Sequence, residues 1–443
     1  MTVRETNSRT TPTRLAALGE SYPEELDMSS FVRQLQGQST HSEILLDLSG
    51  HGHRWRSVRR RLFAAAGFRA VGPVALILIA LALAGVRPAV AQTETVLHSF
   101  TGQDGSLPGP RLTMDSAGNL YGSTVGNYPS IGSIFKLSPS GQLKVLYKFT
   151  DGQNRLFTTG KLVLIKGNLF GVDQTGGTSG NGSIFRLTQT GVFTLLYSFT
   201  GQSDGAFPNG VIADAQGNFY GTTNLGGALG QGTVFKFTPR HGVTVLYSFT
   251  GGSDGGEPFD AALYRDSQGN LYGTTMFDGG KISLGVVFKV TPQGTESVLH
   301  TFLGGSDGAH PKGSLISDGK GNLYGTTSSG EGLHGGTVFR ITTAGVLTEL
   351  HTFLGSDGYS PNAGLAMDAQ GDLFGTTFSG GTSNDGVVFE IDAEDAETVL
   401  HDFSSGDGVT PYAGVIISPQ SDLFGTTGFG GAAGQGTVFE VTP

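Results

Sequence analysis

The sequence contains no cysteine, so disulfide bonds, catalytic thiolates and cysteine-ligated zinc or iron–sulfur centres are excluded. Charged residues are also scarce, at 14% of the 443 positions, whereas glycine occupies 73 of them. Few charges and many glycines are typical of short strands joined by tight turns rather than of helices. The only tryptophan is Trp55, so the rest of the chain uses phenylalanine and tyrosine as its large packing residues.

Charge is distributed unevenly along the chain. Residues 1–91 contain 11 arginines, no lysine and 7 acidic residues, whereas residues 92–443 contain 16 basic and 30 acidic residues. A basic leader therefore precedes an acidic body. Because an acidic body repels a phosphate backbone, the sequence predicts no nucleic-acid partner.

One long apolar run, residues 74–86, lies between an arginine-rich stretch and the small residues Ala89-Val90-Ala91. This order predicts a secretory signal over residues 54–91, with cleavage after Ala91. Extended back to residue 70 the run is about 17 residues long, the lower limit for crossing a bilayer, so an uncleaved membrane anchor over residues 70–86 is the alternative. Both interpretations place the body outside the cytoplasm, as a secreted, periplasmic or cell-surface domain.

The stretch before the signal, residues 1–53, is polar and has little capacity to form a core, so we expect a disordered extension there. Whether translation starts at Met1 or at Met28 is left open by the sequence.

From residue 94 onward one pattern recurs seven times. Each repeat contains a Leu-(Tyr/His)-x-Phe segment, an apolar stretch, an (Asn/Asp)-(Leu/Phe)-(Tyr/Phe)-Gly segment and a (Val/Ile)-Phe-(Lys/Arg/Glu) segment. In GTVFKFTP, Phe235 and Phe237 alternate with Val234 and Lys236, which indicates a strand. Four strands per repeat correspond to one blade of a propeller.

The phase of the repeat predicts how the ring closes. The body opens on the Leu-His-Ser-Phe segment that ends at Phe100 and finishes just after the segment of Phe439, so the last repeat lacks the one strand that the first residues supply. We therefore predict an all-β, seven-bladed β-propeller of four-stranded blades over residues 92–443. Residues 410–443 would give three strands of the last blade and residues 94–100 its outer strand. A linear solenoid, which requires distinct end caps, is the alternative.

The combination of GNLYGTT, a glycine-rich stretch, GTVFK(L/F)TP and TVLYSFTG resembles the GloVer tandem repeat of bacterial surface proteins described as choice-of-anchor repeat proteins. The resemblance covers about residues 94–443, in seven concordant copies. It implies an exported repeat protein without a defined biochemical role, and it therefore supplies neither catalytic residues nor a cofactor.

An Asp-Gly pair follows the outer strand of every repeat. Turn chemistry explains the pair, because aspartate accepts hydrogen bonds from turn amides and glycine adopts positive φ. The functional interpretation is a ring of carboxylates that attracts cations or binds sugar hydroxyls. With no Asp-x-Asp-x-Asp-Gly loop in the sequence, we predict no metal site. The candidate ligand-binding residues are Asp104, Asp204, Asp254, Asp307, Asp357 and Asp407, with Asp151 in the second repeat.

Polar residues specific to one repeat gather in the fifth, where His310, Glu331 and His334 occupy loops expected on one face. They are the candidate catalytic residues, as a His–Glu acid/base pair. The layout has a likeness to streptogramin lyases, which are also seven-bladed propellers. By contrast, four histidines take a position where the other repeats have tyrosine, which favours packing over metal ligation. They are His98, His300, His351 and His401.

Near-equivalent blades favour a non-catalytic binding or scaffold module at the cell envelope. We expect a monomeric body without cofactor, whose partner is a glycan, a peptide or an envelope protein. The alternative is a lyase or hydrolase with its site on the loop face of the fifth blade. The sequence does not identify the ligand or substrate.

Overall fold

The computed structural model describes residues 92–109, 111–125, 132–149, 160–259, 262–277, 284–330 and 335–443. Within these ranges the regular structure consists of strands β1 to β29, which form seven antiparallel sheets. None of the described residues belongs to a helix of the length and apolarity that crossing a membrane requires. The predicted signal or anchor, residues 54–91, and the polar extension, residues 1–53, lie outside the described residues.

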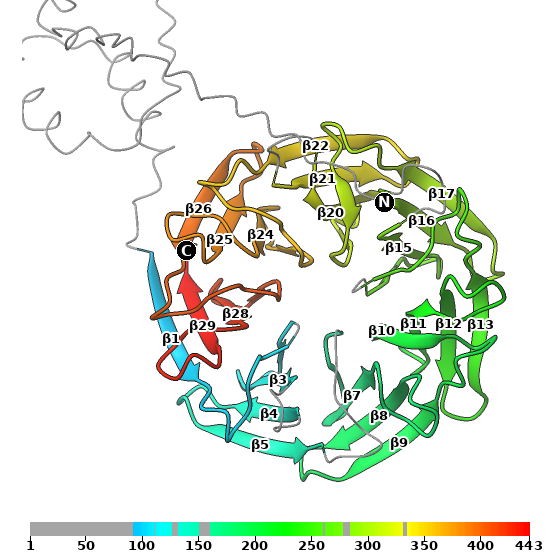
Figure 1. Cartoon of the computed structure of the whole chain (residues 1–443), viewed down its shortest axis with the longest axis horizontal. Coiled ribbons are helices and arrows are strands. Elements are labelled where there is room, and N and C mark those ends of the chain that lie inside the picture. The colour runs from blue at the N-terminus through cyan, green and yellow to red at the C-terminus, as the bar shows by residue number, and fades with distance from the viewer. Residues whose placement is uncertain are drawn as a thin grey trace, which may run out of the picture. The chain divides into compact units, whose positions relative to one another are not determined.

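The seven sheets are the blades of a β-propeller, as the repeat predicts (Figure 1). In the third blade, β10 (Ala206–Ala213), β11 (Phe219–Leu225), β12 (Thr233–Thr238) and β13 (Gly242–Ser248) pair in chain order. The first strand lies nearest the centre of the ring and the fourth lies along its rim. We number the blades in chain order, so the first contains β2–β5 and the seventh contains β27–β29 and β1.

The strands of the other blades have the following bounds. The inner strands are β2 (Thr113–Met114), β6 (Val163–Ile165), β14 (Tyr264–Arg265), β18 (Ala309–Pro311) with β19 (Ile316–Ser317), β23 (Ala366–Met367) and β27 (Ile416–Ile417). The second strands are β3 (Leu120–Thr124), β7 (Asn168–Asp173), β15 (Leu271–Thr275), β20 (Asn322–Ser329), β24 (Leu373–Thr376) and β28 (Leu423–Thr427). The third strands are β4 (Ser133–Leu137), β8 (Ser183–Thr188), β16 (Val286–Val290), β21 (Thr337–Thr342), β25 (Val387–Ile391) and β29 (Thr437–Thr442). The outer strands are β5 (Leu143–Lys148), β9 (Phe193–Ser198), β17 (Glu296–Thr301), β22 (Leu347–Thr352), β26 (Glu397–Asp402) and β1 (Thr93–Ser99).

The ring closes through the first and last strands, as predicted. β1 pairs antiparallel with β29, from Thr93 opposite Thr442 to Ser99 opposite Thr437, and the seventh sheet has the order β1-β29-β28-β27. Figure 1 shows the blue β1 on the outer side of the red β29. No blade is left with a missing outer strand, which would expose unpaired backbone groups.

Glycine and phenylalanine, two of the repeated residues, belong to one packing unit inside each blade. Gly122 on β3 stands opposite Phe135 on β4, and a Cβ atom at Gly122 would lie 2.5 Å from Cζ of the Phe135 ring. Only glycine therefore leaves room for the ring, which is fully buried. Burial of a side chain of this size contributes about 1.5–3 kcal/mol. The same pairing recurs in the other six blades, ending with Gly425 and Phe439.

Neighbouring blades pack face to face through these buried rings. One core cluster joins Tyr220 and Phe249 of the third blade to Leu263 and Phe288 of the fourth. Across the closure, another joins Phe100 and Val438 of the seventh blade to Leu112, Leu120 and Phe135 of the first. The hydrophobic core is thus a series of interfaces between blades, and it continues across the chain ends.

In six blades, the segment that leads from an outer strand into the next inner strand donates a backbone hydrogen bond to the preceding blade. In the third blade Phe207, the β10 residue before Pro208, has a φ of 57° and donates its amide to the carbonyl of Asn181 at 2.8 Å. Positive φ at a non-glycine residue is strained. Because this conformation recurs in six blades, it belongs to the scaffold and not to one site. The six residues, each directly before a proline, are Leu107, Phe207, Glu257, His310, Ser360 and Thr410.

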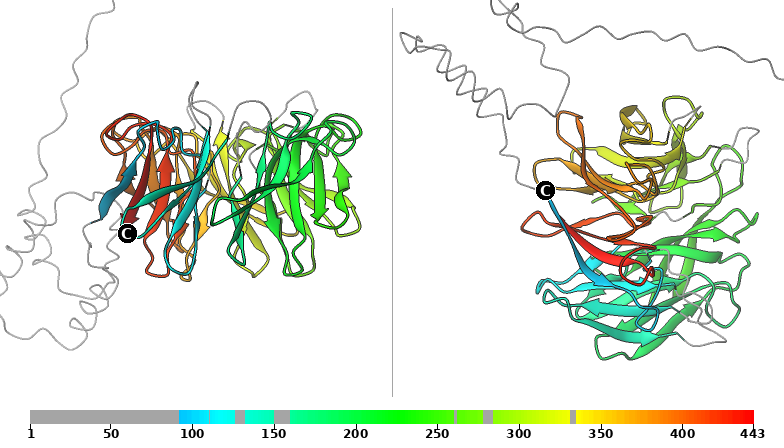
Figure 2. Two further views of the ribbon diagram at one scale, coloured as in Figure 1. Left: turned by 90° about the horizontal axis from the view of Figure 1, so that it is seen from below. Right: turned by 60° about the vertical axis from the view of Figure 1, so that its left-hand side comes forward.

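The loops after the outer strands and those between second and third strands lie on the same face of the ring. Single bridges join them, such as Pro108 to Thr124, Gly256 to Phe277 and Val409 to Phe429. Figure 2 shows the ring edge-on, with its connections gathered on two opposite faces. We call the face that carries these two sets of loops the loop face.

Candidate functional site

The aspartates of the Asp-Gly pairs fold back onto their own loops. The carboxylate of Asp104 accepts hydrogen bonds from the amide and the hydroxyl of Thr101, both at 2.8 Å, and from Nε2 of His98 at 2.9 Å. Burial raises the pKa of Asp104, but these donors outweigh it and hold that pKa below its usual value. The same loop carboxylate is present in the other described repeats, and its oxygens are used within the loop. Cation or sugar binding by this ring stays a prediction.

The alternation of histidine and tyrosine on the outer strands preserves one hydrogen bond. The hydroxyl of Tyr197 donates to Asp204 at 2.9 Å, and Nε2 of His300 lies 3.1 Å from Asp307. Both rings also meet the repeated phenylalanine edge to face, His300 against Phe302 at 4.9 Å between ring centroids. The position therefore serves packing and also fixes the loop aspartate, a role that the sequence did not indicate.

Two groups on the rim bring histidine and carboxylate atoms within 4.8 Å of one another. They are Glu94 with His401 and Asp407, and Glu397 with His351 and Asp357. Each glutamate comes from the outer strand of the next blade, and burial beside an aspartate raises the pKa of Glu94 and of Glu397 to about 7. Histidine and aspartate are already hydrogen-bonded to each other in both groups, so these contacts belong to the loop structure.

The structure places His310 in β18, on the loop face of the fifth blade. Its Nδ1 lies 3.2 Å from the carbonyl oxygen of Met276, and its ring meets Phe277 at 5.6 Å between centroids. Its φ of 55° is the value shared by the residue before proline in six blades, so this strain is not specific to a catalytic site. Glu331 and His334 lie outside the described residues, and the predicted catalytic trio stays a hypothesis.

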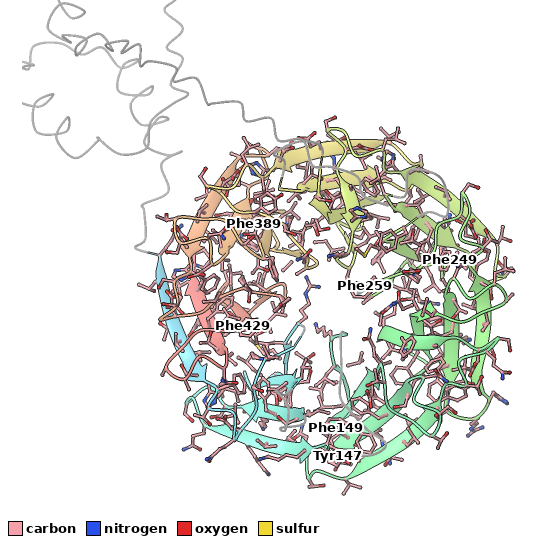
Figure 3. The ribbon with its side chains drawn as sticks, viewed as in Figure 1. Tyr147, Phe149, Phe249, Phe259, Phe389 and Phe429 are labelled. Carbon is pink, nitrogen blue, oxygen red and sulfur yellow. The ribbon has the colours of Figure 1, made fainter. Side chains whose placement is uncertain are left out.

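The strongest candidate site is the central cavity, which the sequence did not reveal. It has a volume of about 910 Å³ and is lined by the inner strands and adjoining loops of all seven blades. Its wall includes Phe259 and Phe429. Figure 3 shows Phe259 beside the central opening, whereas Phe149 and Phe249 lie in the body of the blades. A concave, mostly apolar cavity of this size is typical of a small-molecule site.

The blades differ from one another where they face this cavity. The residue after the loop proline is Lys312 in the fifth blade, Asn362 in the sixth and Tyr412 in the seventh, and all three line the cavity. The residue before the buried Leu or Val of the inner strand is Arg111 in the first blade and Lys161 in the second, where the other five have Gly, Ala or Ser. This variation at two positions of an otherwise regular repeat is the sequence signal that could have located the site.

Arg111 is held in place by hydrogen bonds to a blade that is not its direct neighbour. Its Nη2 donates to the carbonyls of Gly364 and Leu365 on the sixth blade, past the intervening seventh. Glycine at position 414 leaves room for it, since a Cβ there would lie 3.2 Å from Nη2. Burial lowers the pKa of Arg111 to about 10, so the guanidinium stays charged at neutral pH.

Lys161 lies near this guanidinium. Its side chain is accessible to solvent through the cavity, which protein surrounds. This partial desolvation, and then the charge of Arg111, lower the pKa of Lys161 to about 8. Among the described residues, the ammonium has no hydrogen-bond or ion-pair partner.

The described wall of the cavity carries more positive than negative side chains. Three of its described lining residues are cationic, namely Arg111, Lys161 and Lys312, and Asp115 is the only acidic one among them. The Asp115 carboxylate accepts hydrogen bonds from Asn119 and, at 3.0 Å, from the hydroxyl of Tyr121, so it is occupied by its own turn. Arg111 and Lys161 therefore face the cavity without a compensating carboxylate from the described wall.

The repeat pattern identifies the family. A model of the Gloeobacter/Verrucomicrobia repeat matches residues 85–281 and 259–443. The chain belongs to the Gloeobacter/Verrucomicrobia repeat family. This confirms the resemblance that the seven repeats indicated. Among curated proteins, none matches this Gloeobacter/Verrucomicrobia repeat protein.

Solved structures similar to this Gloeobacter/Verrucomicrobia repeat protein share its fold at low identity. The extracellular domain of a putative hybrid two-component system from B. thetaiotaomicron has a TM-score of 0.52 and 14% identity, over 78% of this chain and 39% of that one. The extracellular domain of a putative one-component system from the same organism has a TM-score of 0.52 and 12% identity, over 79% and 40%. This chain therefore spans about two fifths of either protein. A putative 6-phosphogluconolactonase from Bacteroides uniformis has a TM-score of 0.46 and 15% identity, over 69% and 88%. The first two likenesses show the fold alone.

Proposed function

We propose that this protein is an exported, non-catalytic binding module that holds its ligand in the central cavity. The observation that carries the proposal is where the blades differ. The residues that build each blade recur, whereas Arg111, Lys161, Lys312, Asn362 and Tyr412 differ between blades and meet at one cavity. A scaffold alone has no need for different side chains around its axis, but a site for an asymmetric ligand does.

Export is supported by the sequence of the leader. An arginine-rich stretch, the apolar run and a small-residue site over residues 54–91 are the parts of a secretory signal, and residues 70–86 would anchor the protein if the signal stayed uncleaved. The extracytoplasmic location, at the cell envelope or beyond it, agrees with the two structural relatives that are extracellular domains. We propose a monomeric propeller whose partner is a glycan, a peptide or an envelope protein.

The lyase or hydrolase alternative depends on Glu331 and His334, which are outside the described residues. His310, the described member of that trio, does not line the cavity and is bonded to backbone. No contact among the described residues favours catalysis, so we retain the enzyme as a hypothesis only.

Filling the cavity tests the proposal. Ala262 lines the cavity, whereas Ala344 lies exposed in the turn before β22, so Ala262→Trp and Ala344→Trp are matched changes. We expect a screen of envelope glycans, peptides and small organic molecules against the purified full chain to find a ligand that raises the melting temperature of the wild type and of Ala344→Trp but not of Ala262→Trp. A ligand that still stabilises Ala262→Trp, or turnover of a compound instead of binding, would contradict it.

A further inference from the structure

The charge in the cavity is arranged for an anion. Lys161 and Arg111 repel each other, and no acidic side chain of the described wall other than the occupied Asp115 offsets them. Two like charges that repel each other in a partly enclosed site cost free energy, which an anion placed between them would recover. The ammonium of Lys161 has its hydrogen-bonding capacity unused within the described part of the chain.

The guanidinium of Arg111 is preorganised for such a ligand. The bonds to Gly364 and Leu365 both come from Nη2, so within the described ranges Nε and Nη1 keep their N–H groups free. A side chain already held in one position loses little entropy on binding. Charge-assisted hydrogen bonds from guanidinium to carboxylate are among the stronger ones in proteins.

The rest of the wall is mostly apolar, which disfavours a strongly hydrated ligand. Val163, Leu164 and Ile212 line the cavity beside the cationic end, and Phe259 and Phe429 contribute aromatic surface. Polyhydroxylated molecules would lose hydrogen bonds to water against such a wall without replacing them. The volume of about 910 Å³ suits one small organic molecule.

We propose that the cavity takes a small organic anion with an apolar body, whose carboxylate or similar head lies between Arg111 and Lys161 while its body contacts the apolar wall. This inference rests on the proposed function, because it assigns a chemical class to the ligand of the same cavity. It distinguishes that class from acidic sugars, which carry the charge without the apolar body.

The test uses three probes on the full chain at pH 7, measured by calorimetry. They are 2-naphthoate, the uncharged 2-naphthamide of the same shape, and glucuronate, which has the charge and a hydrophilic body. We expect 2-naphthoate to bind, 2-naphthamide to bind at least about tenfold more weakly, and glucuronate not to bind. Equal affinity for 2-naphthoate and 2-naphthamide would overturn the requirement for an anion. Tighter binding of glucuronate than of 2-naphthoate would overturn the requirement for an apolar body.

Variants locate the binding. Lys161→Met should weaken 2-naphthoate binding by roughly tenfold, whereas Lys144→Met, the same change at an exposed position on β5, should leave it unchanged. An unchanged affinity in Lys161→Met would overturn the assignment of the head group. If Ala262→Trp also binds 2-naphthoate like the wild type, the cavity is not the site and the proposed function fails with it. If instead a different ligand is blocked by Ala262→Trp, the proposed function stands and only the chemical class is wrong.

Proton uptake provides a readout that a structural role for Lys161 would not change. Because Lys161 has a pKa of about 8, a bound carboxylate beside it should raise that pKa and draw in a fraction of a proton at pH 8. Calorimetry in two buffers of different ionisation enthalpy measures this uptake. It should be present in the wild type and in Lys144→Met and absent in Lys161→Met, and equal uptake in all three would contradict the proposal.

Discussion

Pro108 packs against Gly436 so closely that a Cβ atom on Gly436 would lie 2.5 Å from the Cδ atom of Pro108. The two residues belong to the first and the seventh blades, so this contact lies across the closure of the ring. Gly436 has a φ of 94°, which only glycine adopts without strain. Equivalent contacts join five other pairs of neighbouring blades, such as Gly336 with Pro361, where the corresponding distance is 2.9 Å. In six blades the glycine before the third strand is thus explained by the proline of the next blade.

The change Gly436→Ala should destabilise the propeller by about 1–3 kcal/mol from backbone strain alone, and further if Pro108 is displaced. Chemical denaturation of the purified chain measures the loss. Gly406→Ala is the control, because Gly406 has no atom within 4 Å of a Cβ and no positive φ. Equal stability of Gly436→Ala and Gly406→Ala would contradict the role of this contact.

Phe100→Ala should destabilise the protein by about 3–5 kcal/mol, because Phe100 is fully buried between the seventh and first blades and its loss leaves a cavity. Leu303→Ala, at a side chain that is 74% exposed, should be close to neutral. Thermal melting compares the two. If Phe100→Ala had the same melting temperature as the wild type, the segment that follows β1 would not be part of the closed core.

His300→Tyr should retain wild-type stability, whereas His300→Phe should lose about 1.5–3 kcal/mol. Tyrosine at this position already donates to the loop carboxylate in other blades, as Tyr247 does to Asp254 at 2.7 Å. Phenylalanine keeps the ring and removes the partner of Asp307. Urea denaturation separates the variants, and equal stability of both would mean that packing alone determines this position.

Glu397→Gln should stabilise the protein at pH 8 but have little effect at pH 5. Burial and then the charge of Asp357 raise the pKa of Glu397 from 4.5 to about 7, so the folded state holds its proton more tightly than the unfolded state. The stability contributed by this proton is fully present below pH 4.5 and is lost as the pH rises through 7. Glutamine has no proton to lose. Glu394→Gln, at an exposed turn, is the charge-matched control. A pH-independent difference between Glu397→Gln and the wild type would contradict the prediction.

The closed ring could be predicted from the sequence because it depends on counting and phase. Seven copies of the segments around Gly122 and Phe135 give the number of blades, and the strand that precedes Phe100 supplies the one that the last repeat lacks. These relationships are linear along the chain. The Gly–Phe contact itself, and the contact between Gly436 and Pro108, depend on registers that only the structure gives.

The cavity is harder to predict, because its signal lies in the exceptions to the repeat and not in the repeat itself. Arg111 and Lys161 occupy, in the first and second blades, a position where the other five blades have a small residue. Lys312 lies three blades after Lys161 in chain order. Their convergence depends on the inner strands of all seven blades meeting at one axis, which no local pattern encodes. His310 has the side chain expected of an acid/base catalyst, but it does not line the cavity. The positive charge of the described wall comes instead from arginine and lysine.

The pairing of β1 with β29 has a consequence for the order of folding. The first six blades each consist of consecutive residues, so each can form as soon as its own segment is available. The seventh has to wait, because its outer strand is made first and its neighbour Thr437–Thr442 is made last. Until then the earliest strand of the body has an unsatisfied hydrogen-bonding edge, and contacts between such distant parts of a chain form slowly. A chain interrupted before residue 437 would therefore lack β29, so the seventh blade, which forms part of the cavity wall, would have no strand to join it to β1.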